Sequence, residues 1–167
     1  MKKVITFLLF PVLCNAQKTG GFASLGPSFL FKSSTPVVGG MLNVGLNIGS
    51  NTTIGPGMEF YKFKGSRAAY IPLYMHLKFY LGDNTARPYI TIAPGYGIYN
   101  ESLYRISVKG GFYIASSLGL HLRDIKKSKS IGPYIQAGIK HLSFNTTGLS
   151  KIESNENYFA VDFGIRF

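Results

Sequence analysis

The chain has 167 residues, enough for one domain with a sizeable core and too few for two. It contains 18 Lys and Arg against 7 Asp and Glu, which gives a formal net charge of +11. A basic balance can indicate nucleic-acid binding, but the lysines are scattered apart from three in one predicted turn (126–129), so we expect no nucleic-acid partner.

The first 16 residues have the pattern of a cleaved signal peptide. Met1-Lys2-Lys3 is a short positive segment, and Val4 to Leu13 is an apolar run of about ten residues. A helix that crosses a bilayer needs about twenty. Cys14-Asn15-Ala16 places small residues at the positions that a signal peptidase reads, so we expect cleavage before Gln17. The mature chain, 17–167, would have no cysteine and, without Lys2 and Lys3, a net charge of +9.

Cys14 allows one alternative, a lipoprotein in which this cysteine bears the lipid anchor. That processing requires a small residue just before the cysteine, and Leu13 is large, which favours the cleaved signal peptide. An exported chain rarely meets nucleic acid, so its positive charge is better suited to anionic outer-membrane lipid and lipopolysaccharide.

The mature chain shows the alternation of β-strands and no helical periodicity. In the segment 42–49 every second residue is a large aliphatic one, and the residues between are Asn or Gly. Because successive side chains of a strand point to opposite faces, one face is apolar and the other small and polar. The longest connections are predicted as loops at 100–110 and 145–156. Turn signals predict eight strands, at 19–32, 37–49, 53–64, 68–81, 87–99, 111–123, 131–144 and 157–167.

Three features favour an all-β fold that is a transmembrane antiparallel up-and-down β-barrel of about eight strands. Strands of about 11–14 residues exceed the five or six of soluble sheets and suit a tilted bilayer crossing. A face rich in Gly, Asn, Tyr and charges suits a narrow polar lumen better than a dry core. An even strand number places both termini on the periplasmic side. A soluble lipocalin-like barrel is the alternative, and four prolines inside predicted strands count against our choice: Pro27, Pro56, Pro72 and Pro94.

The same alternation directs a set of polar side chains into the predicted lumen. Unpaired charges there would be costly, so we expect opposite charges to meet. If the last two strands pair symmetrically about Lys151, Asp162 lies opposite Lys140. The expected lumen set comprises Glu59, His76, Lys78, Arg123, Gln136, Lys140, Asp162 and Arg166.

Five short motifs support a family assignment: Ile71-Pro72-Leu73, Leu77-Lys78-Phe79-Tyr80, Arg87-Pro88-Tyr89, Gly95-Tyr96-Gly97 and Gly164-Ile165-Arg166-Phe167. They resemble the outer-membrane β-barrel domain family of Bacteroidetes, whose members are often called porin-family proteins. The resemblance implies the barrel fold and a location in the cell outer membrane. It also implies that the C-terminal Phe167 is the signal read by the barrel-assembly machinery. It implies a fold and no particular activity.

One constellation points to chemistry. His141-Leu142-Ser143, followed by Asn145, resembles the His-x-Ser-Asn motif of outer-membrane lipid A 3-O-deacylases, which are also eight-stranded barrels. That resemblance implies a serine nucleophile and a histidine base, with Glu153 or Glu156 as the carboxylate that orients the base. The alternation places His141 and Ser143 on the outward face near the outer rim. One extra residue separates the Ser from the Asn, which favours an interfacial pair without catalytic function.

The sequence predicts no cofactor and no metal site, because the three histidines lie in different predicted strands and no carboxylate is suitably spaced. An eight-stranded barrel has a lumen filled with side chains. We therefore predict a small outer-membrane barrel with a structural or surface-interaction role rather than an open pore. The alternatives are a lipid A acyl-ester hydrolase that uses Ser143 and His141, and a soluble periplasmic protein that binds a small apolar ligand.

Overall fold

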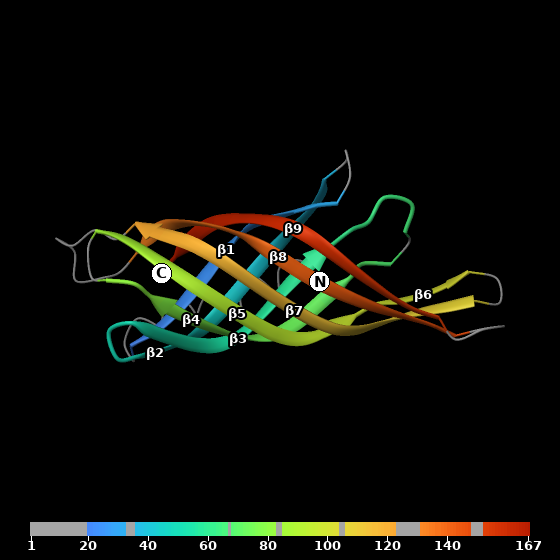
Figure 1. Cartoon of the computed structure of the whole chain (residues 1–167), viewed down its shortest axis with the longest axis horizontal. Helices are drawn as coiled ribbons and strands as arrows, with labels where there is room; N and C mark the ends of the chain where they lie inside the picture. The colour runs from blue at the N-terminus through green and yellow to red at the C-terminus, as the bar shows by residue number, and fades with distance from the viewer. Residues whose placement is uncertain are drawn as a thin grey trace, which may run out of the picture.

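The computed structural model describes residues 20–32, 36–66, 68–82, 85–103, 106–122, 131–147 and 152–167. The predicted signal peptide (1–16) and Arg123 lie outside these residues. No helix among them has the length and hydropathy needed to span a bilayer. The strands (Figure 1) are β1 (Gly21–Phe31), β2 (Val37–Ile48), β3 (Thr52–Tyr61), β4 (Ile71–Tyr80), β5 (Ala86–Ile98), β6 (Asn100–Leu103), β7 (Ile106–Leu122), β8 (Gly132–Thr147) and β9 (Ile152–Arg166).

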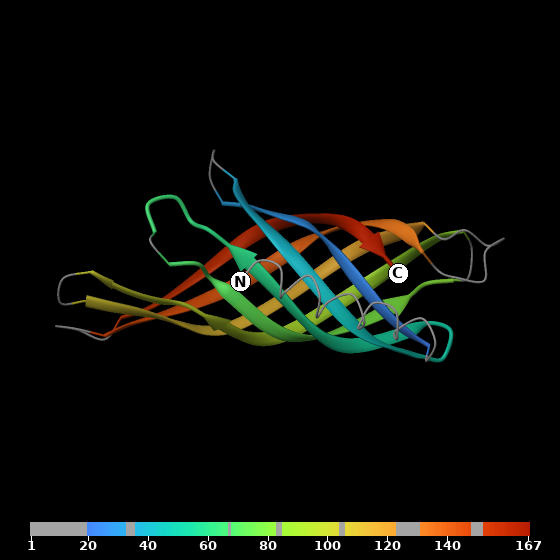
Figure 2. The ribbon, with the colours of Figure 1, turned by 180° about the vertical axis from the view of Figure 1, so that it is seen from behind.

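The strands form one closed antiparallel sheet in which neighbours in sequence are neighbours in space. β9 pairs with β1, and β5 pairs with β7, so the sheet has no open edge at either place (Figure 2). β6 follows β5 after a break at Tyr99 and pairs with the same strand, β7, so the two together act as one barrel strand. The described residues therefore form an eight-stranded up-and-down β-barrel, which confirms the predicted fold class. Closure pairs backbone groups that an open sheet would leave exposed.

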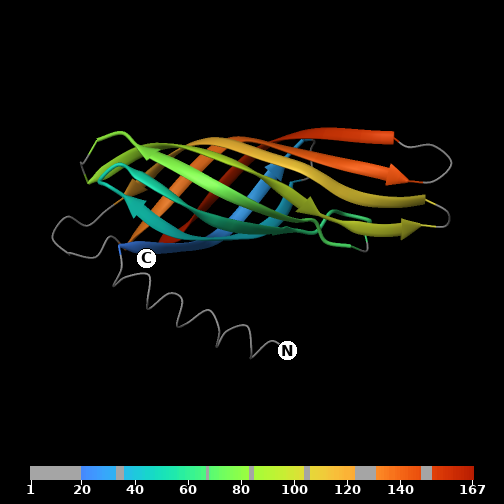
Figure 3. The ribbon, with the colours of Figure 1, turned by 90° about the horizontal axis from the view of Figure 1, so that it is seen from below.

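The two ends of the barrel differ. Both termini of the described barrel meet at one end, which we call the terminal end. There Phe167 N donates to Ala23 O at 2.8 Å and Ala23 N donates to Phe167 O at 3.2 Å. At the opposite end, which we call the distal end, β6 and the adjoining parts of β7, β8 and β9 project beyond the other strands (Figure 3).

Two predicted loops are largely strand. Asn100 pairs with Lys109 in the β6–β7 hairpin, and Asn145 pairs with Glu153 between β8 and β9. The predictions of loops at 100–110 and 145–156 were therefore wrong. Where a hairpin projects beyond the barrel, both of its faces can be polar, so the alternation that marks the barrel strands disappears from the sequence.

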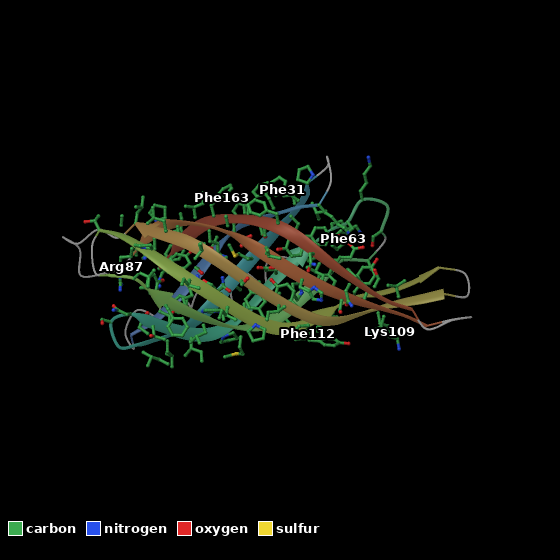
Figure 4. The ribbon with its side chains drawn as sticks, in the orientation of Figure 1. Phe31, Phe63, Arg87, Lys109, Phe112 and Phe163 are labelled. Atoms are coloured by element: carbon green, nitrogen blue, oxygen red, sulfur yellow. The ribbon has the colours of Figure 1, made fainter. Side chains whose placement is uncertain are left out.

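Large apolar side chains point outward, and the residues between them point into the lumen. In β4, Leu73, Met75 and Phe79 are 41–49% exposed, whereas His76 and Lys78 are at most 5% exposed. Phe31, Phe112 and Phe163 lie on the outside of the barrel (Figure 4). This is the arrangement that period-two alternation dictates for a closed sheet.

The four prolines lie inside strands without shifting the register. Pro56 faces Met75 of β4, while its ladder to β2 is interrupted between the pairs Asn43–Gly57 and Leu46–Ile54. The other three follow the same rule: one ladder is kept, and the other is interrupted or ends. Because proline has no N–H, it loses a hydrogen bond toward only one neighbour. The register shift between β7 and β8 lies elsewhere, between Gly110 and Tyr113.

Inward-facing glycines make room for tyrosine rings. A Cβ at Gly57 would meet the ring of Tyr74, and a Cβ at Gly119 would meet the ring of Tyr89. A narrow lumen cannot hold a large side chain at every position, so large residues on one strand need small residues on the next.

Candidate functional site

The centre of the lumen is an ion-pair network around Lys140 of β8. Its Nζ lies 2.9 Å from Glu59 Oε1 of β3 and 2.9 Å from Asp162 Oδ1 of β9. It also donates to Tyr61 OH at 2.9 Å and Ser28 Oγ at 3.0 Å. All five side chains are buried. Two short ion pairs on one ammonium offset much of the cost of removing three charges from water.

Neutral side chains donate further hydrogen bonds to the two carboxylates. Glu59 accepts hydrogen bonds from Tyr61 OH at 2.7 Å, Tyr113 OH at 2.9 Å and Tyr74 OH at 3.3 Å. Asp162 accepts from Gln136 Nε2 at 2.8 Å and from Ser28 Oγ at 2.5 Å. The network joins side chains of six strands: β1, β3, β4, β7, β8 and β9. It therefore ties the walls of the barrel together through the lumen.

The predicted contact between Lys140 and Asp162 is present, but the predicted register is wrong. Asp162 lies opposite Gln136, and Lys140 lies opposite Tyr158. The ladder runs out to Thr146–Ile152, so it is centred midway between those residues rather than on Lys151. A long lysine side chain still reaches the carboxylate along the lumen wall.

Cations and aromatic rings fill the terminal side of the lumen. Lys78 Nζ lies 5.0 Å from the ring centre of Tyr89 and 5.2 Å from that of Tyr134. The guanidinium of Arg166 lies 4.2 Å from the ring centre of Phe22, and its Nη2 donates to Asn47 Oδ1 at 2.5 Å. Contacts of this kind with ring faces stabilise a desolvated cation less completely than a carboxylate does.

Arg87 holds the turns at the terminal end (Figure 4). Its Nη2 donates to Ser50 O at 2.8 Å, and its Nε donates to Gly82 O at 3.0 Å. Gly49 precedes the first of these carbonyls with φ of 68°, a left-handed conformation that favours glycine. The resemblance motif Arg87-Pro88-Tyr89 thus includes a residue that fixes two short turns.

An aromatic cluster closes the distal side of the lumen. Its closest contacts are Tyr70 with Phe144, whose ring centres lie 5.1 Å apart, and Tyr99 with Phe144, at 5.6 Å. Phe63 lies 6.1 Å from Tyr158 and 6.3 Å from Tyr70. A cavity of about 20 Å³ is lined by Lys78 and by Lys140 with its two carboxylates. That volume holds about one water molecule.

The structure does not assemble the predicted catalytic group. His141 Nδ1 lies 2.7 Å from Asn157 Oδ1, and the Ser143 hydroxyl donates to Asn155 Oδ1, so each pairs across to β9. Glu156 lies on the opposite face, where it accepts from Tyr158 OH at 2.5 Å.

Glu156 also forms an ion pair with Lys32 at 3.1 Å. The side chain of Glu153 lies outside the described residues. Successive residues of a strand face opposite sides, so Glu156 cannot orient a base on the face of Asn155 and Asn157. The geometry therefore gives no support to a Ser–His–Glu hydrolase. In the described ranges no group of three or more His, Cys, Asp or Glu is placed to hold a metal ion.

Sequence reasoning missed several members of the lumen network. Four further side chains contact the central charges: Ser28, Tyr61, Tyr74 and Tyr113. The available signal for them was their position in the strand, because every second residue faces the lumen. Tyr61, for example, is two residues from Glu59 in the same strand and so must share its face.

Fold and lumen define a class: small closed antiparallel barrels with an apolar exterior and a polar, side-chain-filled interior. Among solved structures the chain is similar to Neisserial surface protein A, with a TM-score of 0.59 and 11% identity over 88% of this chain and 96% of that one. It is also similar to the N-terminal β-barrel domain of OprF from Pseudomonas aeruginosa, with a TM-score of 0.50 and 12% identity over the same shares. At these identities the likeness shows the fold. No protein-family model and no curated protein sequence matches the chain.

Proposed function

We propose that this chain is an integral outer-membrane barrel with a structural or surface-interaction role. The observation that carries the proposal is the exterior: large apolar side chains of β1 to β5 and of β7 to β9, such as Leu118 at 67% exposure, face away from the protein. A soluble monomer rarely exposes an apolar surface beyond a few hundred Å². A lipid environment accepts such a surface when the backbone is paired in a closed sheet.

The lumen favours a plugged barrel over an open pore. Rings close its distal side, the Lys140 network crosses its centre, and the cavity that Lys78 and this network line holds about one water molecule. Solute passage would require breaking buried ion pairs. The chain therefore acts through its exterior and its distal end rather than by conduction.

The proposed orientation places the terminal end in the periplasm and the distal end outside the cell. Export through a signal peptide at 1–16, recognition of Phe167 by the barrel-assembly machinery and membership of the Bacteroidetes porin-family barrels belong to this proposal. One structural neighbour is, by its name, a surface protein. Exposed lysines at the distal end suit the phosphates of lipopolysaccharide: Lys32, Lys62, Lys64 and Lys109, the last of which is labelled in Figure 4.

Membrane fractionation tests this proposal. The full-length gene, expressed in a bacterium with an outer membrane, should yield a mature protein in the outer-membrane fraction. In detergent that protein should migrate differently on a gel before and after boiling, because a closed barrel resists unfolding until heated. Recovery of mature protein in the soluble periplasmic fraction would refute the proposal and favour the soluble barrel.

A further inference from the structure

The buried charges of the lumen do not balance. The described residues include four buried cations, Lys78, Arg87, Lys140 and Arg166, but only two buried carboxylates. Lys140 lies within 2.9 Å of both carboxylates. Arg166 at the terminal end donates to the neutral Asn47 Oδ1. Leaving out Arg87, which lies at the turns of the terminal end, three buried cations meet two buried carboxylates among the described residues, so one positive charge is in excess in surroundings where an uncompensated charge is costly.

Lys78 is the buried cation whose surroundings are least complete. It is 5% exposed, and among the described residues its ammonium meets the faces of Tyr89 and Tyr134 rather than a carboxylate. Ring faces accept no conventional hydrogen bond, whereas an ammonium has three N–H donors.

Further buried polar groups that have no hydrogen-bond partner among the described residues surround Lys78. Thr53 of β3 and Thr91 of β5 are its direct cross-strand neighbours on either side. Both are at most 5% exposed, and in the described structure neither Oγ1 has a hydrogen-bond partner. The same holds for both ring nitrogens of His76, which is 1% exposed and two residues from Lys78. Direct cross-strand neighbours have Cβ atoms about 5 Å apart.

These groups line a cavity of the right size for a small ion. His76, Lys78 and Thr91 all contribute to the wall of the 20 Å³ cavity. Glu59 and Asp162 line it too, but Lys140 lies between them. The space holds a particle of about the size of a water molecule and is too small for a phosphate or a sugar. Water would satisfy the hydroxyls but would leave the excess charge uncompensated.

We propose that the lumen binds one chloride-sized monovalent anion at Lys78, held by the ammonium, the Thr91 hydroxyl and the His76 ring, with the Thr53 hydroxyl beside them. The anion accepts hydrogen bonds from donors that have no acceptor in the described part of the chain, and it lowers the excess positive charge. It is a structural component of the plugged lumen, because residues of β2 to β5 and of β7 to β9 line the cavity.

Chloride-35 NMR line width tests the proposal with the mature chain (17–167) refolded in a zwitterionic detergent. Chloride is titrated at constant ionic strength, maintained with sulfate, which is too large for the cavity. We expect saturable excess broadening that bromide displaces. Thr91→Val removes one donor at nearly constant volume and should weaken binding about tenfold, the effect of one lost hydrogen bond to an ion.

Two further variants sharpen the result. Lys78→Met should abolish the saturable broadening. Thr52→Val, at the residue before Thr53 and on the opposite face, is the matched control and should bind chloride as the native chain does. Absence of saturable broadening in the folded native chain would overturn the proposal, as would equal broadening in the native and Thr91→Val proteins. The threonine variants keep the test valid if Lys78→Met does not fold.

Discussion

Replacing Lys140 with methionine is the sharpest perturbation of the lumen. Met keeps most of the side-chain volume but removes the ammonium that lies 2.9 Å from both Glu59 and Asp162. Both carboxylates then remain buried without a counter-ion, although tyrosine, serine and glutamine donors still contact them. Removing one partner of a buried ion pair costs about 3–5 kcal/mol. We expect a loss of that size in the free energy of unfolding.

Equilibrium unfolding in urea measures this loss. The chain has no Trp, so far-UV circular dichroism in lipid vesicles or detergent is the suitable signal. A charge-free variant, Lys140→Met with Glu59→Gln and Asp162→Asn, is the control, because it removes the unpaired charges together with the ammonium. It should recover most of the lost stability. A Lys140→Met protein within about 1 kcal/mol of the native chain would refute the reasoning.

Two other substitutions test the packing of the lumen and the hydrolase alternative. Gly57→Ala should destabilise the barrel by about 1–3 kcal/mol, because the new methyl group would meet the hydrogen-bonded ring of Tyr74. Urea unfolding measures this loss. Gly40→Ala, whose Cβ would only touch Gly26 O at an ordinary 3.9 Å, is the control that should change stability little. Ser143→Ala should leave the acylation of lipid A unchanged in mass spectra of cells that express it, because none of the described carboxylate side chains reaches His141 on the outward face. A change in acylation confined to the native chain would restore the hydrolase.

The face of the sheet on which each residue lies was the part of the fold that the sequence could predict. Polar residues alternate with Leu73, Met75 and Phe79. Because a strand has only two faces, the lumen-facing residues could be distinguished from the outward-facing ones without knowing how the strands pair. Glu59, Lys140 and Asp162 were placed on the lumen side for the same reason, and the structure brings them together.

Register and strand ends could not be predicted in the same way. The β8–β9 register depends on where the hairpin turns, and Lys151 was the wrong centre, so Asp162 faces Gln136 instead of Lys140. The projecting β6–β7 hairpin begins with three polar residues, Asn100-Glu101-Ser102, which show no alternation and so gave no signal for a strand. The prolines inside the predicted strands counted against a barrel, but the structure accommodates them. A strand such as β3 can lose pairing toward one neighbour while keeping it toward the other.

The orientation of side chains toward lipid is the central claim, and spin-label accessibility in lipid vesicles tests it most directly. The mature chain (17–167) has no native cysteine, so a nitroxide can be attached at Leu118→Cys, on the barrel exterior, and at Lys109→Cys, on the projecting part of the same strand. We predict that the label at 118 is relaxed by oxygen dissolved in the bilayer and shielded from a water-soluble nickel complex, with the reverse at 109. Equal access of the nickel complex to both labels would contradict a membrane-spanning barrel.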